Sequence, residues 1–267
     1  MMKKLWILIA LVGVVFLVNA QDEEEVVFET TREEQLFKDS SHPLNQLVAL
    51  HARSEADLAV LDKLVDKLDK SAKKKKFTEW FLAEVFYKSH QYALKDYQRH
   101  STFNDLLEEG KYDCVSGSAL FAYFLDRYEF NYEIIETDFH VFVLVHQDDK
   151  TYVMESTEPR AGLITDQASV KEYIGNFLPA SGIKKSKAAS ELAGIKHNEG
   201  NTIYSSINLK QLAGLQYYND AVFHFNEGDV ETAKRQLYKA KQIYAVERVL
   251  ALDEYLNGEE KKSLARR

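Results

Sequence analysis

Hydrophobic residues recur with a helical period in the first and last thirds of this chain and with a strand period in the middle. After a serine cap at Ser54, leucine and valine return every three or four residues from Leu58 to Leu68, which predicts an amphipathic helix. An aromatic-rich stretch over residues 77–97 continues the helical pattern, with side chains suited to core packing. The basic run at residues 73–76 between them is interpreted as a solvated turn, or as an electrostatic handle for an acidic partner.

The next segment carries recognisable helix boundaries. Ser101 and Thr102 are typical of an N-cap before a short helix, and Gly110 offers a residue that can end it in the left-handed conformation. A second helix is predicted over residues 114–125, where small and large apolar residues are available for burial.

Strand patterns follow at residues 132–136, 139–146 and 151–155. Short gaps join these runs, so an antiparallel meander is the simplest arrangement, with the last turn at residues 147–150. A helix followed by such a sheet predicts an α+β fold.

A small, polar, lysine-containing segment at residues 186–201 is typical of a linker, and the pattern beyond it is helical. Two helices flank a turn at residues 226–229 and resemble one tetratricopeptide-type repeat. The resemblance lies in the small and apolar packing residues Ala221, Gly228, Ala233, Leu237 and Ala240. Stacked repeats usually need about three units for stability. We therefore expect residues 202–267 to form a helical hairpin docked on the main domain or on a partner.

The N-terminus has the pattern of an export signal. Lys3 and Lys4 precede an apolar run, and the small residues before Gln21 suit cleavage there. Residues 1–20 are therefore predicted to be a signal peptide, and the protein to be periplasmic or secreted in a bacterium. The apolar run is shorter than the roughly 20 residues of a comfortable membrane span, so no stable membrane insertion is expected after cleavage. An uncleaved anchor is the alternative. Residues 21–185 then form the main domain.

The net charge argues against one class of function, and the cysteine content suggests another. The formal net charge is −8, which argues against non-specific binding of nucleic acid. The single cysteine, Cys114, excludes an internal disulfide. Exported proteins use cysteine for disulfides or for chemistry, so a lone thiol is a candidate nucleophile. The competing interpretation is a small buried hydrophobic residue.

Three residues in chain order supply the groups that a cysteine nucleophile needs. Cys114 is expected in the first turn of a helix, where the partial positive charge favours the thiolate and the backbone N–H can donate to an oxyanion. His140 lies on the second predicted strand, and Glu155 closes the third. Counted outward from the turn, position 140 faces about position 157, which brings Glu155 near the imidazole.

These segments resemble the transglutaminase-like superfamily, whose core is a cysteine at a helix N-terminus followed by an antiparallel sheet that carries a histidine and an acid. The likeness lies in residues 113–120, 138–143 and 152–157, and it covers roughly residues 103–163. It implies a papain- or transglutaminase-like core, in which N-terminal helices precede a nucleophile helix packed on the sheet. One departure is that the usual acid is aspartate, whereas this chain has Glu155.

The resemblance also implies a mechanism. Cys114 would attack an amide or ester carbonyl, His140 would accept the thiol proton, and Glu155 would orient the imidazole. Tyr112 is the best candidate for an oxyanion or auxiliary group, because an aromatic residue often stands near that position; packing over the helix end is the alternative. Hydrolysis of a peptide or protein amide, without a cofactor, is the first hypothesis.

Two other interpretations stay open. The fold could serve as a catalytically inactive binding or scaffold module that docks a protein partner through its C-terminal helices. Cys114, His140 and His146 could instead ligate a metal, but they lack a compact ligand spacing, so no metal site is predicted.

Overall fold

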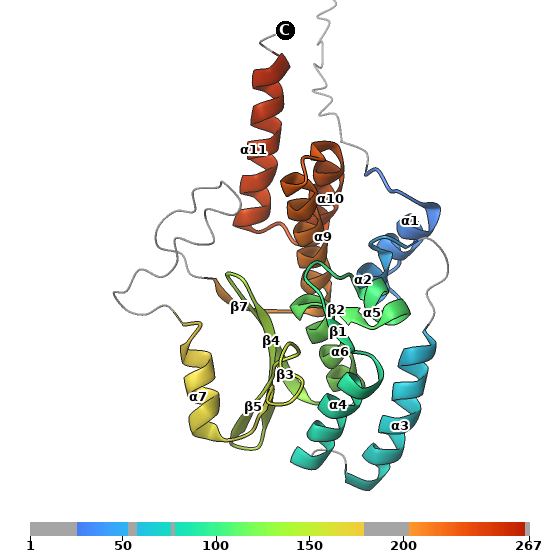
Figure 1. Ribbon diagram of the computed structural model, residues 1–267, viewed down its shortest axis with the longest axis vertical. Coiled ribbons are helices and arrows are strands. Elements are labelled where there is room, and N and C mark those ends of the chain that lie inside the picture. The colour runs from blue at the N-terminus through green and yellow to red at the C-terminus, as the bar shows by residue number, and fades with distance from the viewer. Residues whose placement is uncertain (1–25, 53–57, 76–77, 179–202, 265–267) are drawn as a thin grey trace, which may run out of the picture.

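The structure is a computed structural model that describes residues 26–52, 58–75, 78–178 and 203–264, and it shows a mixed α+β fold (Figure 1). The predicted signal peptide, the Ser54 cap and the predicted linker lie outside these ranges. Within the described ranges, no helix combines the length and the apolar character that a membrane span requires. The α+β prediction is confirmed at the level of fold class.

Helices make up the first part of the described chain. They are α1 (Thr31–Lys38), α2 (Asn45–Ala49), α3 (Ala59–Lys75) and α4 (Glu79–Tyr92). The predicted leucine-rich and aromatic helices correspond to α3 and α4, which bury their apolar faces because burial of such side chains drives packing. The short α1 and α2 were not predicted, because neither carries a long hydrophobic repeat.

The two helices before the sheet begin and end as their capping residues predict. In α5 (Phe103–Glu109), Thr102 forms a capping box with Asp105, and Gly110 ends the helix at φ 73°. A side chain at Gly110 would also meet the Cγ of Lys95 at 2.6 Å, so this turn requires glycine. The next helix is α6 (Cys114–Arg127). Flanking α5, the short strands β1 (Asp96–Tyr97) and β2 (Lys111–Tyr112) pair in parallel.

Among the described residues, a five-stranded antiparallel sheet follows with the order β6-β5-β4-β3-β7. Its strands are β3 (Asn131–Thr137), β4 (Val141–Gln147), β5 (Lys150–Met154), β6 (Leu163–Ile164) and β7 (Tyr204–Ile207). The predicted meander is confirmed in β3 to β5. Gln147 pairs with Lys150, and Val143 pairs with Met154, which is the register that sets position 140 opposite position 157.

Strand β4 is buried on both faces, and its side chains alternate between two cores. Val141, Val143 and Val145 belong to the main core on the α6 side. Phe142 and Leu144 belong to a smaller core, which includes side chains of α7 (Gln167–Gly175). The sheet therefore lies between α6 and α7 (Figure 1). Helix α7 was not predicted from the sequence.

The predicted C-terminal hairpin is present as α9 (Leu209–Asn226) and α10 (Val230–Ile243), and α11 (Glu247–Leu264) follows it. The prediction of residues 202–267 as purely helical missed β7, which pairs with β3 inside the main sheet. This strand is short and only partly apolar, so its pattern gave a weak signal. The C-terminal region thus shares both the sheet and the core of the preceding region.

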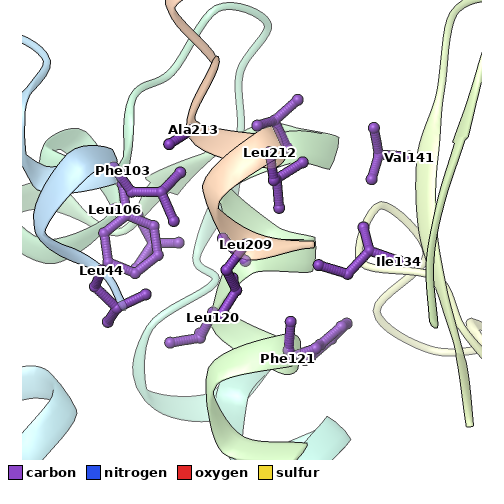
Figure 2. Packing of buried hydrophobic residues seen from close by; sticks show 14 of the residues in the cluster. Leu44, Phe103, Leu106, Leu120, Phe121, Ile134, Val141, Leu209, Leu212 and Ala213 are labelled. Atoms are coloured by element: carbon purple, nitrogen blue, oxygen red, sulfur yellow. The ribbon is translucent and has the colours of Figure 1, made fainter. Parts of the chain in front are cut away.

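Helix α9 runs through the centre of the molecule, against α6 and α2. Figure 2 shows its apolar residues between helices on one side and the sheet on the other. The labelled side chains are Leu44, Phe103, Leu106, Leu120, Phe121, Ile134, Val141, Leu209, Leu212 and Ala213. Because these residues come from separated parts of the chain, the core forms only when the C-terminal helices are in place.

A buried glutamine of α9 satisfies backbone groups of two other elements. The Gln216 Oε1 accepts a hydrogen bond from the Phe103 N–H at 2.8 Å, and its Nε2 donates to the Leu47 carbonyl at 2.9 Å. Only 4% of Gln216 is exposed. Its amide therefore joins α2, α5 and α9 at a place where water cannot replace it.

We predict that Gln216→Leu lowers the free energy of unfolding by about 2–4 kcal/mol, because it leaves two buried backbone groups without partners. Urea denaturation at neutral pH measures this change. Gln91→Leu, at an exposed position of α4, is the matched control and is expected to stay within about 0.5 kcal/mol of wild type. An equal effect of the two substitutions would contradict the prediction.

Candidate active site

A buried carboxylate lies at the centre of the predicted site. Glu155 directly follows β5, and 3% of the residue is exposed. One carboxylate oxygen accepts hydrogen bonds from the Thr157 N–H at 2.8 Å and the Thr157 hydroxyl at 2.7 Å. The other oxygen contacts His140 Nε2 and accepts a hydrogen bond from the Tyr173 hydroxyl. The structure thus brings together Glu155 and His140, as predicted, and adds two hydroxyl groups.

These partners keep the carboxylate charged despite its burial. Burial raises the pKa of the Glu155 carboxyl, but the hydrogen bond and charge of His140, together with the Tyr173 and Thr157 hydrogen bonds, outweigh it and hold this pKa below its usual value. Burial and the neighbouring Glu155 charge raise the pKa of Tyr173 far above its usual range. Tyr173 therefore remains a hydrogen-bond donor at any physiological pH.

His140 is held at the point where β4 begins. Its backbone N–H donates to the Thr137 hydroxyl at 3.1 Å, and its carbonyl accepts from the Thr137 N–H at 2.8 Å. The imidazole stacks on Phe142 and Phe177, with ring centroids 6.3 and 5.9 Å away. About 22% of its side chain is exposed. The ring is thus oriented by its neighbours and still accessible from solvent.

Cys114 is the first residue of α6, as predicted, and it is half-buried. The Ser118 hydroxyl, one turn further along α6, donates a hydrogen bond to the carbonyl of Val141, the residue after His140, at 3.2 Å. The start of α6 therefore lies against the start of β4. This arrangement follows from the packing of α6 on β4.

The electrostatics of the thiol differ from the expectation that the helix N-terminus would favour the thiolate. Burial raises the pKa of the Cys114 thiol well above its usual range, the negative charge of Asp113 adds to this, and the N–H of Val141 opposes it. Asp113 caps the helix by accepting from the N–H groups of Val115 and Ser116, each at 2.9 Å. Its carboxylate thereby offsets the positive helix end beside the thiol.

The Asp113 carboxyl is itself perturbed. Burial raises its pKa to about 6, although hydrogen bonds from Ser116 and Val115 act in the opposite direction. Asp113 is therefore charged at neutral pH and becomes neutral in mild acid. The protonation of this cap changes the field at Cys114 within the physiological range.

Tyr112 lies on β2, immediately before the cap of α6, and is 1% exposed. Its ring makes edge contacts with His90 and Tyr97, at centroid distances of 6.1 and 5.9 Å. Burial, followed by the charge of Glu155, raises the pKa of Tyr112 to about 12, so its hydroxyl stays protonated. A Cβ at Gly117 would lie 3.2 Å from Tyr112 Cδ2, so the ring packs against the start of α6, as the alternative interpretation expects. The oxyanion role stays a prediction.

A glycine in the nucleophile helix brings α6 close to the segment that carries the acid. A Cβ at Gly117 would lie 2.6 Å from the Cβ of Ser156, the residue after Glu155. Real Cβ atoms do not approach so closely, so any larger residue would push the helix and this segment apart. The glycine thus lets the helix that begins at Cys114 pack closely against the segment that follows Glu155.

Two residues of the site were not recognised as partners of the acid. Thr157 belongs to the segment that resembles the acid strand, but its role as a donor to Glu155 was not foreseen. Tyr173 lies on α7, and no local pattern connects it to Glu155, so only the folded chain reveals it. A sequence pattern can reveal a partner two residues away, such as Thr157, but not a partner on a separate helix, such as Tyr173.

The alternative metal set of Cys114, His140 and His146 is not assembled. His146 lies six residues along β4 from His140, which is roughly 20 Å in a strand. Its ring pairs instead with Glu133 at 2.9 Å and Thr151 at 3.2 Å. His140 and His146 therefore cannot share one ion with Cys114.

The site thus combines a capped helix start that carries a thiol with a histidine whose Nε2 contacts a buried carboxylate. Such a set can support nucleophilic and acid–base chemistry. Comparison of the chain with models of known protein families, with curated proteins and with solved structures found no match.

Proposed function

We propose that this protein is a transglutaminase-like cysteine acyl-transfer enzyme that hydrolyses amide bonds of a peptide or protein through Cys114, His140 and Glu155. The observation that carries the proposal is the contact of the buried Glu155 carboxylate with His140 Nε2, at the start of the strand that packs against the helix of Cys114. We also propose that the fold has a papain- or transglutaminase-like core. The order of the elements supports this, because the helix of Cys114 is followed by the strand next to His140 and then by the strand that ends before Glu155.

A second glutamate–histidine pair in the same sheet provides a contrast. Glu133 and His146 lie 2.9 Å apart, but the Glu133 side chain is 43% exposed, which is typical of a surface ion pair of little energetic consequence. The Glu155 side chain is 3% exposed and has three partner residues. A buried carboxylate is costly unless it is fully paired, so the Glu155–His140 pair, and not the exposed Glu133–His146 pair, favours a functional role.

The pKa of the thiol determines the first step. The raised pKa of the Cys114 thiol favours its protonated form at rest, so in the proposed first step His140 takes its proton as the sulfur attacks the carbonyl carbon. Glu155 engages Nε2, so we assign this proton transfer to Nδ1. The charged Glu155 stabilises the imidazolium that forms. The proton then passes to the leaving amine, and the carbonyl C–N bond breaks to give a thioester.

Water completes the reaction in the same geometry. His140 accepts a proton from water as its oxygen attacks the thioester carbonyl, and the thiol is released with its proton restored. The Cys114 N–H, in the first turn of α6, is the proposed donor to the oxyanion in both steps. Tyr112 is the proposed auxiliary donor. The reaction requires no cofactor.

Exposed aromatic residues next to the site suit a peptide or protein substrate. Phe139, beside His140, is 67% exposed, and Tyr97, whose ring contacts Tyr112, is 46% exposed. Large exposed aromatic side chains are typical of surfaces that bind other chains. Export to the periplasm or beyond remains part of the proposal, on the pattern of residues 1–20 alone.

One observation favours a second candidate function. The raised pKa of the half-buried Cys114 thiol also suits a catalytically inactive binding module that docks a protein partner through its C-terminal helices. In that case the thiol would be a small buried side chain. The two candidates differ in turnover, which the next experiment measures.

We predict that the wild-type protein releases peptides from fluorescently labelled casein and that Cys114→Ala abolishes this release. His140→Asn is expected to lower the rate by about 10²–10⁴-fold, because it removes the general base. Glu155→Gln is also expected to lower the rate, because glutamine cannot stabilise the positive charge that forms on the imidazole. The measurement is the initial rate of fluorescence release at neutral pH.

The control for Glu155→Gln is Glu133→Gln, which makes the same change in the exposed pair and should leave the rate unchanged. Equal rates in wild type and Cys114→Ala would exclude Cys114 as the nucleophile. A folded wild-type protein with no turnover would favour the inactive module.

A second prediction concerns the resting thiol. Asp113 has a pKa of about 6 and is charged at pH 8, where its charge raises the pKa of Cys114. Asp113→Asn removes this charge, and asparagine still caps a helix, so more thiolate forms. Alkylation of Cys114 by iodoacetamide at pH 8 is expected to become about 3–10-fold faster.

Asp126→Asn is the matched control, because Asp126 is exposed near the other end of the same helix. Its alkylation rate should equal that of wild type. If Asp113→Asn left the rate unchanged or slowed it, the proposed influence of the cap on the thiol would be wrong.

A further inference from the structure

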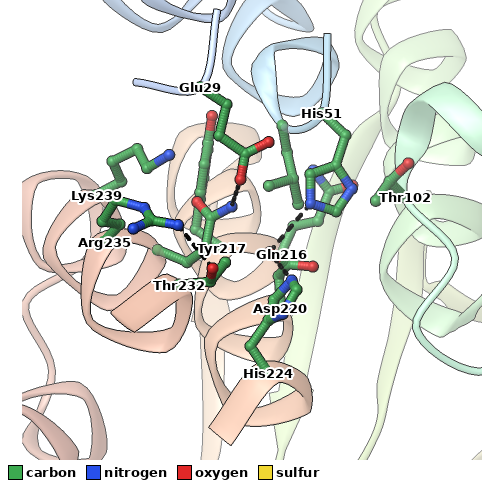
Figure 3. A network of polar contacts seen from close by, with 12 residues as sticks. Glu29, His51, Thr102, Gln216, Tyr217, Asp220, His224, Thr232, Arg235 and Lys239 are labelled. Carbon is green, nitrogen blue, oxygen red and sulfur yellow. Dashed lines mark hydrogen bonds and ion pairs between the residues drawn. The ribbon is translucent and has the colours of Figure 1, made fainter. Parts of the chain in front are cut away.

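A second cluster of titratable side chains lies away from the thiol, between the segment after α2 and helix α9. Figure 3 shows His51, Asp220 and His224 directed toward one another, with Asp220 between the two imidazoles. His51 Nε2 lies 3.3 Å from Asp220 Oδ2, and His224 Nε2 lies 3.7 Å from the same oxygen. None of these residues takes part in the proposed acyl transfer.

The separations match the requirements of a metal ion. One ligand atom from each residue lies within 4.8 Å of the other two. Ligands about 2.0–2.2 Å from a tetrahedral zinc ion stand roughly 3.3–3.6 Å apart. The two nitrogen–oxygen distances, 3.3 and 3.7 Å, are close to the edges of such a tetrahedron, and the two imidazole nitrogens lie within 4.8 Å of each other.

The buried Asp220 carboxylate is only loosely paired by the two imidazoles. The Asp220 side chain is 8% exposed, and its Oδ2 is buried without a hydrogen bond of ordinary geometry from the described residues. Buried carboxylate oxygens are normally paired or bound to a metal. Oδ2 is the oxygen that both imidazoles face, so the unsatisfied atom lies where the ion would bind.

The surroundings suit such an ion. His224 turns its other nitrogen, Nδ1, toward the Asp229 carboxylate, 3.6 Å away, on the side opposite to Asp220. Metal-bound histidines commonly have a carboxylate on their second nitrogen, which fixes the orientation of the ring. The His51 side chain is 35% exposed and that of His224 is 23% exposed, so solvent can reach the cluster.

We propose that His51, Asp220 and His224 bind one divalent first-row metal ion, zinc in the first place. Two imidazoles and one carboxylate form an N₂O donor set, and a water molecule would complete a tetrahedron. His51 and His224 are 173 positions apart in the sequence, one in the N-terminal part of the chain and one in the C-terminal part. The ion would therefore join the segment after α2 to the C-terminal helices.

The chain offers a direct test with Zn²⁺ as the probe. The full chain, produced without a histidine tag and stripped with a chelator, is titrated with ZnCl₂ by calorimetry. We expect one equivalent to bind. At a free concentration about 100-fold above Kd, the melting temperature is expected to rise by roughly 5–10 °C, because the ion binds the folded form.

Asp220→Asn and His224→Gln are expected to lose at least 10-fold in zinc affinity and to lose the thermal shift. His146→Gln, which removes a histidine from another histidine–carboxylate pair, should bind like wild type. Circular dichroism identifies a variant that does not fold. X-ray absorption of the zinc-loaded wild type supplies a readout independent of the variants, with two imidazole ligands expected.

Several results would overturn the proposal. They are no stoichiometric zinc binding by wild type, undiminished binding by the folded Asp220→Asn or His224→Gln variants, loss of binding in His146→Gln, and an absorption spectrum without imidazole ligands. Because Cys114 and His140 lie outside this cluster, the outcome does not depend on whether the protein has turnover.

Discussion

The Glu155 carboxylate is the group on which the arrangement of the site depends. A buried charge destabilises a fold by several kcal/mol unless nearby groups satisfy it. Here the partners come from three places: the start of β4 through His140, the chain just after β5 through Thr157, and α7 through Tyr173. Moving any of these elements would leave the carboxylate incompletely paired, so one charge fixes the imidazole and holds α7 to the sheet.

The helix start that carries Cys114 shows two opposing effects on one thiol. The helix dipole and the nearby N–H groups favour the thiolate, but at surface sites a dipole is worth only about 0.3–1 kcal/mol. Burial and the Asp113 cap act in the opposite direction and dominate. In the proposed mechanism, the thiol is therefore deprotonated by His140 during attack and is not a preformed thiolate.

Local patterns were sufficient for part of this structure. The two-residue turn before Lys150 and the strand alternation fixed the register that places Glu155 near His140, and Thr102, Gly110 and Asp113 fixed the ends of two helices. These features depend on neighbours in the sequence, or on pairing across a short turn.

Features that depend on long-range contacts were not predictable. Tyr173 donates to Glu155 from a helix with no strong hydrophobic pattern. Strand β7 is a short edge strand that lies far in the sequence from its partner β3, and Asp220 contacts His51 although the two are far apart in the sequence. The charge state of Cys114 was also misjudged, because its burial is set by the packing of α6 on the sheet. No property of the isolated segments encodes these contacts.

In the proposed mechanism Cys114 forms a covalent acyl intermediate, which intact-mass spectrometry of the acid-quenched wild-type protein can detect. After mixing with an activated ester such as p-nitrophenyl acetate, we expect one acetyl group per chain, located on Cys114 by peptide mapping and lost again as water completes the cycle. Acetylation confined to surface lysines, or an unmodified Cys114 in the folded protein, would contradict it.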